Sequence, residues 1–237
     1  MSRARAFAPQ GENRLLAGLP GGVRQELAAR AEKISLDLKT PLYQSNEKIA
    51  HVYFPLSGVM SLVIRMSDGT AVEVASIGNE GLVGTPVFLG AERSSTDALC
   101  QVPGDALKLA VADFKDFLRQ QNLHDLVRRY TQALIIQISQ STACNHLHSV
   151  HERMCRWLLM MHDRVAAPEL ALTQEFLAQM LAVRRPTVTV VAGTLQQAKL
   201  IEYRRGRIRI LDREGLEKGA CECYHVVRRE FERLFRD

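Results

Sequence analysis

Basic side chains gather in one short segment of the chain, which suggests contact with a polyanion. Between Arg184 and Arg209 the sequence has seven basic residues and one acid, Glu202. Residues 149–237 hold 16 Lys or Arg against 12 Asp or Glu, so most of the net charge of +5 lies in this part. A local positive patch favours nucleic acid, although a solvated cationic surface gives the same count.

The segment from Leu181 to Gln197, LAVRRPTVTVVAGTLQQ, combines two conflicting structural signals. Its β-branched run has strand propensity, whereas its apolar residues recur at helical spacing. Pro186 suits the first turn of a helix, where a missing N–H costs nothing. A β-branched residue costs a helix roughly a few tenths of a kcal/mol. We therefore expect a helix from about Arg185 to Ala198. Its expected buried residues are Val188, Val191, Ala192 and Leu195.

A shorter helix precedes this one, and a tight turn separates the two. Thr173 is a natural N-cap for the shorter helix, and the turn falls at Ala182-Val183. The apolar face between them consists of Phe176, Leu177, Met180 and Leu181. Two short helices joined in this way form a helix-turn-helix, whose second helix lies in the DNA major groove.

An arginine-rich β-hairpin is expected directly after the second helix. Its strands are residues 200–203 and 208–211, and its turn is RRGR, residues 204–207. Four arginines on so small a hairpin suit contact with DNA phosphates. The hairpin would therefore act as a wing beside the helix-turn-helix.

The first half of the chain changes from short helices to short strands. Residues 13–39 carry apolar residues at helical spacing, interrupted at Pro20-Gly21-Gly22, and predict short helices. From Ile34 to about Leu109 the apolar runs are short and are separated by turn residues. VMSLVIRM, SDGT and AVEVASIG read as a β-hairpin with an Asp-Gly turn. Its expected apolar face is Met60, Leu62, Ile64 and Met66. The spacing is typical of an antiparallel barrel or jelly roll.

A long helical segment follows from about Val111, without Pro or Gly for some forty residues. Its apolar residues step by four and three, as in a coiled-coil seam. The stripe consists of Leu123, Val127, Tyr130, Leu134, Ile138 and Ser141. We expect this stripe to form a dimer seam, because so long a helix is hard to cover within one small domain. The alternative is packing against its own barrel. A domain boundary is expected near residue 148.

Taken in order, these parts resemble the Crp/Fnr transcription factors (cyclic-AMP receptor protein/fumarate-nitrate regulator). The similarity extends from about residue 15 to the C-terminus and rests on FPLSGVMSL, SDGTAVEVASIGNEGLVG and, most specifically, LTQEFLAQMLAVRRPTV. It implies an α+β fold with three parts. These are an effector-sensing β-barrel of the cyclic-nucleotide-binding type (13–110), a dimerisation helix (111–148) and a winged helix-turn-helix (149–237).

The resemblance also implies a function. The chain would be a cytoplasmic, homodimeric regulator and not an enzyme. It would bind a palindromic operator in double-stranded DNA, with RNA polymerase as a further partner. An effector in the barrel would shift the dimer helix and change the spacing of the two recognition helices.

Carried over position by position, the resemblance places DNA-contacting residues at the start of both short helices and on the wing. Arginine suits bidentate contact with guanine, and threonine suits thymine methyls or phosphates. The expected residues are Gln174, Arg184, Arg185, Thr187, Thr189, Arg204, Arg205 and Arg207. Pro186 stands where well-studied relatives have a base-reading Glu. A different operator sequence is therefore expected.

The signature for cyclic nucleotide is incomplete. Relatives that bind cAMP hold the phosphate with an Arg-Ser pair, and Arg93-Ser94 matches it. The ribose-binding Glu position is Val83 here, with Glu80 the nearest acid. The purine-facing position on the dimer helix is Ile138, with Ser139 beside it. We expect an effector other than cAMP, or none, with a cyclic nucleotide as the alternative. Candidate effector residues are Glu80, Arg93, Ser94 and Ser139.

Other sensor chemistries have weak support in the sequence. No cysteine precedes Cys100, which argues against the N-terminal iron–sulfur cluster of some relatives. His51 is the available barrel ligand for haem. His146, His148 and His151 lie close together, but no acid or cysteine obviously converges on them. Cys221 and Cys223 would point about 200° apart on a helix, so one of them should pack in the core. No metal or cofactor site is predicted.

Two competing functional classes remain from the sequence. A cupin-like barrel enzyme needs a His/Glu metal set, yet residues 34–110 contain one histidine, His51. A nucleotide-regulated scaffold that does not bind DNA is disfavoured by the arginine-rich wing. The five cysteines favour free thiols in a reducing compartment. The basic start, MSRARAFAPQ, is expected to be a disordered tail without a secretory signal, and no run of residues is apolar enough to span a membrane.

Overall fold

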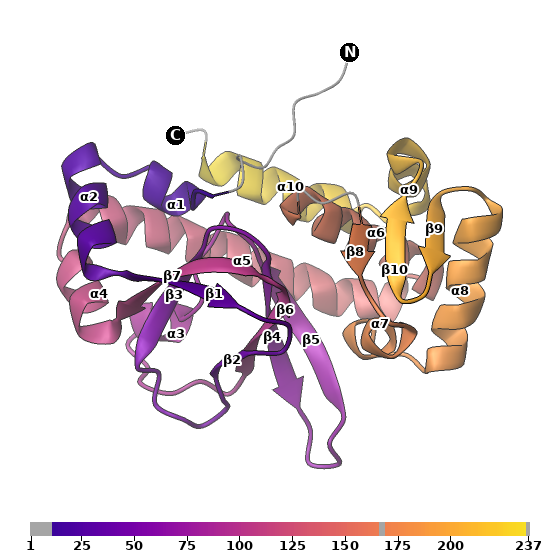
Figure 1. Ribbon diagram of the computed structural model, residues 1–237, viewed down its shortest axis with the longest axis horizontal. Coiled ribbons are helices and arrows are strands. Elements are labelled where there is room, and N and C mark those ends of the chain that lie inside the picture. Colours follow the sequence, from indigo (N-terminus) through magenta and orange to yellow (C-terminus); the bar gives the residue numbers. More distant parts are fainter. Residues whose placement is uncertain (1–10, 166–168, 236–237) are drawn as a thin grey trace.

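The computed structural model describes residues 11–165 and 169–235, so the predicted N-terminal tail lies outside the described residues. A β-rich unit and a smaller helical unit lie side by side, and one long helix runs behind both (Figure 1). No helix in the two described ranges is long and apolar enough to cross a membrane.

Two short helices open the described chain, α1 (Arg14–Ala17) and α2 (Gly21–Arg30). Asn13 attaches the first of them to the barrel. Its side-chain oxygen accepts from the backbone N–H groups of Leu15 and Leu16. Its amide nitrogen donates to the carbonyls of Pro55 and Gly81, at 3.0 and 2.8 Å. One buried side chain thus caps α1 and fixes it to the end of one barrel strand and to one barrel loop.

Two antiparallel sheets form the predicted β-rich unit. The first has the order β1-β7-β3 and comprises β1 (Glu32–Leu36), β7 (Gly104–Ala110) and β3 (His51–Pro55). The second has the order β2-β6-β4-β5 and comprises β2 (Pro41–Tyr43), β6 (Asp97–Val102), β4 (Val59–Arg65) and β5 (Ala71–Ile77). A short helix, α3 (Thr85–Phe88), lies between β5 and β6 in the sequence.

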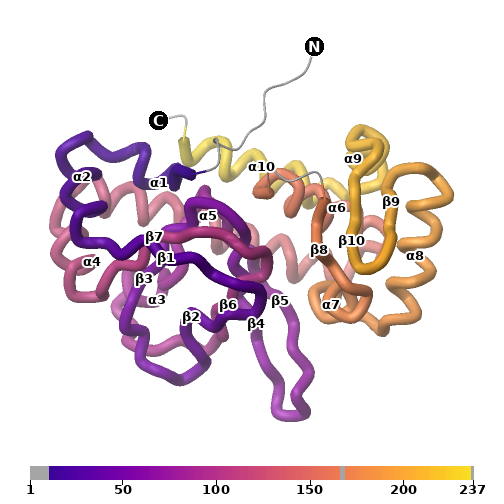
Figure 2. The backbone as a smooth tube through the Cα atoms, in the orientation of Figure 1, coloured from indigo at the N-terminus to yellow at the C-terminus, as the bar shows by residue number. Residues whose placement is uncertain are grey.

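The predicted hairpin is β4–β5, and Gly69 at its turn has φ 86°. Met60 and Leu62 are buried as expected, whereas Ile64 and Met66 are 39% and 57% exposed. The prediction of one apolar face is therefore wrong for Ile64 and Met66. The register shifts after Leu62, and the tip beyond it extends past the rest of the sheet (Figure 2).

The long helical segment is divided, contrary to the expectation of one continuous helix. Helix α4 (Val111–Phe117) ends before α5 (Gln121–Leu147) begins. No Pro or Gly marks the break. Phe114 and Phe117 are 0% and 2% exposed within the barrel core, so tertiary packing sets the direction of α4.

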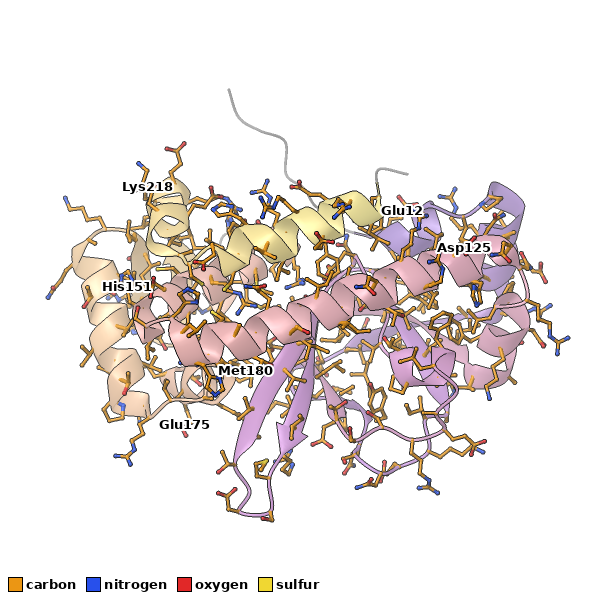
Figure 3. All side chains as sticks on the ribbon, turned by 180° about the vertical axis from the view of Figure 1, so that it is seen from behind. Glu12, Asp125, His151, Glu175, Met180 and Lys218 are labelled. Carbon is orange, nitrogen blue, oxygen red and sulfur yellow. The ribbon has the colours of Figure 1, made fainter. Side chains whose placement is uncertain are left out.

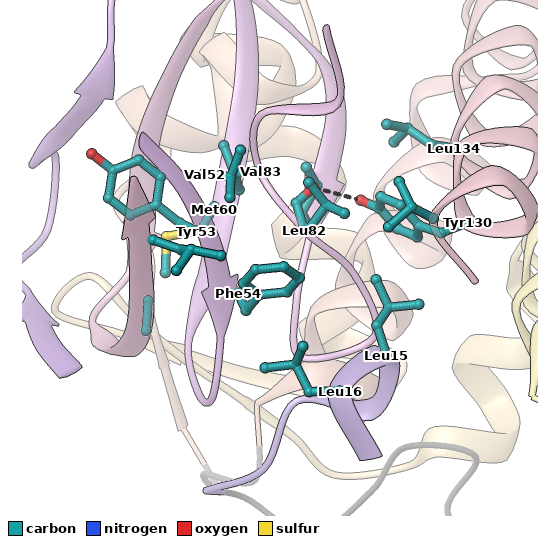
Figure 4. Packing of buried hydrophobic residues seen from close by; sticks show 14 of the residues in the cluster. Leu15, Leu16, Val52, Tyr53, Phe54, Met60, Leu82, Val83, Tyr130 and Leu134 are labelled. Carbon is teal, nitrogen blue, oxygen red and sulfur yellow. Dashed lines mark hydrogen bonds between the residues drawn. The ribbon is translucent and has the colours of Figure 1, made fainter. Parts of the chain in front are cut away.

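The predicted dimer seam on α5 packs against the chain's own barrel instead. Leu123, Val127, Tyr130 and Leu134 all belong to the barrel core. The Tyr130 hydroxyl donates to the Leu82 carbonyl at 3.1 Å (Figure 4). The four-and-three stripe was misassigned because a helix packed on a sheet needs the same apolar spacing as a coiled coil.

The last helix, α10 (Cys223–Leu234), returns along α5 (Figure 3). Val227, Phe231 and Leu234 join the same core as the barrel. The Phe231 ring lies 6.4 Å from the Tyr130 ring, centroid to centroid. The C-terminal helix therefore covers a second side of α5, although its sequence position falls in the segment expected to be the DNA-binding unit.

The smaller unit begins with α6 (Val150–Arg164), directly after α5 ends. Ser149 caps this helix in a reciprocal hydrogen-bonded pair with Glu152, which explains a helix break without Pro or Gly. The rest of the unit comprises β8 (Glu169–Ala171), α7 (Gln174–Met180), α8 (Arg185–Gln197), β9 (Ile201–Arg204), β10 (Arg207–Ile210) and α9 (Arg213–Gly219). Its three strands form a small sheet in the order β8-β10-β9.

Candidate nucleic-acid interface

Helices α7 and α8 form the predicted pair with a tight turn between them. The Thr173 hydroxyl accepts from the Phe176 N–H at 3.1 Å, as expected of an N-cap. Ala182 in the turn has φ 50°, a left-handed conformation that short turns between helices require. The guanidinium of Arg153 on α6 donates to the Leu181 carbonyl at the end of α7. The turn is therefore supported from the helix behind it.

Helix α8 begins at Arg185, and the expected burial is largely confirmed. Val188, Ala192 and Leu195 are 0%, 3% and 0% exposed, while Val191 is half-buried. Pro186 lies in the first turn. The strand propensity of the segment is thus overridden by an apolar face that packs at helical spacing.

The outer face of α8 carries the residues predicted to read DNA. Arg184, Arg185 and Thr189 are exposed, and Thr187 is half-buried. The Thr189 hydroxyl donates to Gln174 Oε1 at 2.9 Å. Gln174 on α7 and Thr189 on α8, which are both expected to contact DNA, therefore contact each other.

Val190 on the same face was missed by the sequence reasoning. Its side chain is 69% exposed, which is unusual for a large apolar residue. The signal was available, because a residue two positions from the buried Val188 points away from the core of a helix.

The wing turns at Arg205 and Gly206, whose φ values are 51° and 73°. Two consecutive left-handed residues make the tight hairpin turn that suits the twist of the strands. Leu172 N–H donates to the Gly206 carbonyl at 2.8 Å, so the wing tip is tied to the segment before α7.

The arginines of the wing differ in whether they form ion pairs with Glu169 or Glu202. Arg209 contacts both acids, at 3.1 and 3.8 Å, and Arg207 lies 3.6 Å from Glu169. Within residues 11–165 and 169–235, no ion pair involves the other two wing arginines, Arg204 and Arg205. Their charges remain the most available to a phosphate.

An open hollow of about 540 Å³ lies where α7, α8 and the wing meet. It is lined by Thr173, Gln174, Glu175, Arg185, Tyr203, Arg205 and Gly206. Glu175 marks its position in Figure 3, at the outer end of α7. Two arginines from separate elements flank this hollow, which suits an anionic backbone.

The candidate effector residues are not brought together by hydrogen bonds or ion pairs in the described parts of the chain. Arg93 is exposed and donates to the Asn46 carbonyl. The Ser94 hydroxyl is paired with Thr96 Oγ1 at 2.9 Å. Ser139 is exposed on α5. The fourth residue, Glu80, is fully buried and contacts the smaller unit.

Glu80 forms a buried ion pair with Arg164, the last residue of α6. The Nε–Oε1 distance is 2.7 Å, and both side chains are at most 2% exposed. Arg164 also donates to Ser76 Oγ at 2.9 Å and to Gln137 Oε1 at 3.3 Å. One guanidinium thus joins β5 and the loop after it to α5. Sequence reasoning missed Arg164 and gave Glu80 a different role.

A second contact between the two units involves Glu73 on β5. Its carboxylate accepts from Trp157 Nε1 on α6 at 2.9 Å and from Ser61 Oγ at 2.7 Å. Burial raises the pKa of Glu73, and the two hydrogen bonds oppose that shift. The carboxylate therefore holds a proton more strongly here than in the unfolded chain.

The cysteine and histidine expectations need correction. Helix α10 begins at Cys223, so Cys221 is outside it and helical geometry does not separate the two thiols. Both are buried in one cluster with Cys144 and His148. His146 instead contacts the Thr142 carbonyl.

Comparisons with known protein families agree with this architecture. The profile described as a cyclic nucleotide-binding domain matches residues 33–121. The profile described as a Crp-like helix-turn-helix domain matches residues 152–218. The chain belongs to the Crp/Fnr family. It is therefore a Crp/Fnr-type transcription regulator with a helix-turn-helix DNA-binding domain, and a cupin-like enzyme gains no support.

Solved Crp/Fnr-type structures share the fold at low sequence identity. FixK2 from Bradyrhizobium japonicum is 16% identical, with a TM-score of 0.69 over 81% of this chain and 98% of that one. TTHB099, a CRP-family regulator from Thermus thermophilus, is 19% identical, with a TM-score of 0.68 over 80% and 96%. CLP from Xanthomonas campestris, a c-di-GMP-responsive regulator, is 14% identical, with a TM-score of 0.64 over 81% and 100%. A comparison with curated proteins gave no match.

Replacing Glu73 by Gln should change how stability depends on pH. The native carboxyl has the higher pKa, so its contribution to the free energy of unfolding falls as pH rises from the unfolded-state pKa, about 4.3, through the native one. We expect Glu73→Gln to gain stability relative to the unmodified chain across that window, as measured by urea unfolding. The exposed Glu47→Gln is the control. A stability difference that does not vary with pH would contradict the assignment.

Proposed function

We propose that this regulator is a homodimer that reads a two-fold symmetric operator through the exposed start of α8. The observation that carries the proposal is the position of Arg185. It is exposed at the first turn of α8 and flanks the hollow that Arg205 borders from the wing. A recognition helix enters the major groove with its N-terminal residues against base edges.

The base-reading set would combine arginines, threonine and one apolar side chain. Arg184 and Arg185 suit guanine O6 and N7, while Thr187 and Thr189 suit thymine methyls or phosphates. We add Val190, because its exposed methyl groups suit contact with a thymine methyl. The Pro186 side chain offers no group that could accept a hydrogen bond from cytosine. The operator should therefore differ from those read by relatives with Glu at this position.

The sugar–phosphate backbone would be held on either side of the groove. Gln174, fixed by Thr189, stands at the start of α7. Arg204 and Arg205 supply wing charges without an internal acid partner among the described residues, and Arg207 supplies a weaker one because Glu169 lies nearby. Such phosphate contacts set the register of the protein on the duplex, and most of the salt dependence of binding comes from them. Contact with RNA polymerase stays a prediction of the family resemblance.

The dimer would form on the face of α5 that neither the barrel nor α10 covers. The exposed residues of this face step by four and three along the helix. They are Arg128, Gln132, Ile135, Ser139 and Thr142. Ile135 is 49% exposed and stands at the centre of the stripe. A second copy of α5 would cover it.

The barrel would respond to an effector other than cAMP, or to none. Glu80 is occupied by Arg164, and Val83 bonds through its backbone to Tyr53. Val83 has no carboxylate, and that of Glu80 is buried, with Oε1 paired to Arg164 and Oε2 without a hydrogen-bond partner. A cyclic-nucleotide response is the second candidate, favoured by the matching domain profile and by Arg93 beside Ser94.

Arg185→Ala should lose operator recognition. In a gel-shift selection from random duplexes, the unmodified chain should enrich a palindrome. The variant should bind that palindrome about 5- to 150-fold more weakly, as expected for about 1–3 kcal/mol from one bidentate contact. The control is Arg229→Ala, an exposed arginine on α10. Failure to enrich any site, or unchanged affinity in Arg185→Ala, would refute the proposal.

Ile135→Glu should abolish the dimer, because two carboxylates would face each other across the seam. Sedimentation equilibrium should give a dimer for the unmodified chain and a monomer for the variant. Leu89→Glu, at an apolar position 65% exposed on the barrel, should remain dimeric. A monomeric unmodified chain, or a dimeric Ile135→Glu, would rule out this seam.

Thermal unfolding with added cAMP, cGMP or cyclic di-GMP separates the effector hypotheses. We expect no rise in melting temperature with cAMP, because a ribose-binding carboxylate is missing at Val83. A rise that Arg93→Ala abolishes would support the cyclic-nucleotide alternative instead. A rise that Arg93→Ala leaves unchanged would remove Arg93 from the effector site.

A further inference from the structure

Four potential metal ligands converge where α5 ends and α10 begins. Cys144 and His148 lie one helical turn apart at the end of α5. Cys221 precedes α10, and Cys223 is its first residue. One ligand atom from each residue can be chosen so that all four lie within 4.8 Å of one another. Cys144 and Cys221 are 77 residues apart in the sequence, and His148 and Cys223 are 75 residues apart. The fold therefore brings these four residues together.

The distances between these atoms match a single tetrahedral ion. Bond lengths of about 2.3 Å to sulfur and about 2.0–2.1 Å to nitrogen place two sulfur ligands about 3.8 Å apart, and sulfur and nitrogen about 3.6 Å apart. Cys144 Sγ and Cys221 Sγ are separated by 3.5 Å, as are Cys223 Sγ and His148 Nδ1. A disulfide requires about 2.05 Å, so the two thiols are too far apart to be bonded as they stand.

A second layer of polar groups orients the ligands. Glu222 Oε2 lies 3.2 Å from His148 Nε2, the ring nitrogen on the side away from the cysteines. Such a carboxylate favours the tautomer with a free Nδ1, and metal-binding histidines commonly have this partner. Gln140 Nε2 donates to Cys223 Sγ at 3.1 Å, which stabilises a thiolate. Ordinary packing of thiols in a core requires neither contact.

The cluster of cysteines is separate from the two hydrophobic cores. Cys144, Cys221 and Cys223 are at most 3% exposed, yet they form a group separate from both cores. Cys155 and Cys100, by contrast, are embedded among apolar side chains of those cores. Three sulfur atoms and one imidazole therefore form a polar cluster of their own.

We propose that Cys144, His148, Cys221 and Cys223 bind one structural Zn²⁺ ion. A Cys₃His set is a closed tetrahedral site in which the protein supplies all four ligands and no position is left for substrate. Thiolate and imidazole donors favour zinc over the oxygen-seeking Mg²⁺ and Ca²⁺. An iron–sulfur cluster would need its ligands farther apart, because several metal and sulfide atoms must fit between them.

The ion would fasten α10 to α5 beside the junction of the two units. Binding would release the protons of those ligands that are thiols in the metal-free chain. It would leave a site with one net negative charge, given three thiolates around a divalent ion. The distal part of α10 packs in the barrel core and Tyr224 packs in the core of the smaller unit, so zinc would add an attachment at the first residue of α10.

Metal content of the purified full-length chain tests the proposal. Elemental analysis by mass spectrometry should find about one zinc per chain. Cys223→Ser and His148→Ala should lose it, whereas His146→Ala, a histidine one half-turn away on the same helix, should keep it. Iron together with acid-labile sulfide would overturn the proposal. A metal-free chain with a Cys144–Cys221 disulfide in non-reducing peptide mapping would do the same.

A milder variant covers the case in which ligand replacements fail to fold. Glu222→Gln keeps all four ligands and removes the charge on the His148 partner. Competition with a chromophoric chelator should show zinc affinity lowered by about 10- to 100-fold, as for other outer partners of metal ligands. Re-adding Zn²⁺ to chelator-treated unmodified chain should raise its melting temperature. Unchanged affinity in the variant and no rise on re-addition would refute a structural zinc site.

Discussion

Arg164 is the residue on which the arrangement of the two units depends. Its guanidinium is buried between the barrel, α5 and the smaller unit, and it is paired with Glu80 at 2.7 Å. Breaking such a pair from one side leaves an unpaired buried charge, which costs about 3–5 kcal/mol. Arg164 is the last residue of α6, and α6 supports the helix pair α7–α8 through Arg153. The position of Arg164 therefore fixes the helix that supports the DNA-reading pair. The buried ion pair thus relates the barrel to α8.

Different sides of helix α5 make two observed contacts and would make two proposed ones. One side fills the barrel, a second supports α10, and its end supplies two ligands of the proposed zinc site. The remaining exposed side is available for a second copy. Since these surfaces share one rigid rod, a shift of α5 within the barrel would also move the junction near His148. This is the physical basis on which an effector could act on DNA binding.

Local patterns predicted much of the fold. The N-cap at Thr173, the helix with Pro186 in its first turn and the Arg205-Gly206 turn each follow from neighbouring residues, and the structure has them where expected. Contacts between distant segments were not predictable in this way. The stripe containing Tyr130 has the same spacing whether it meets a barrel or a second helix. Likewise, Glu80 gave no sign that its partner stands 84 residues later.

The Arg164–Glu80 pair should hold the recognition helix in a fixed relation to the rest of the proposed dimer. A double Arg164→Met/Glu80→Met variant removes both charges at similar volume, so it should remain folded. The most direct measurement is the ratio of its affinities for the full selected operator and for an isolated half-site. We expect this ratio to fall by about 5- to 150-fold, the range of a coupling free energy of about 1–3 kcal/mol. An unchanged ratio in a folded variant would contradict it.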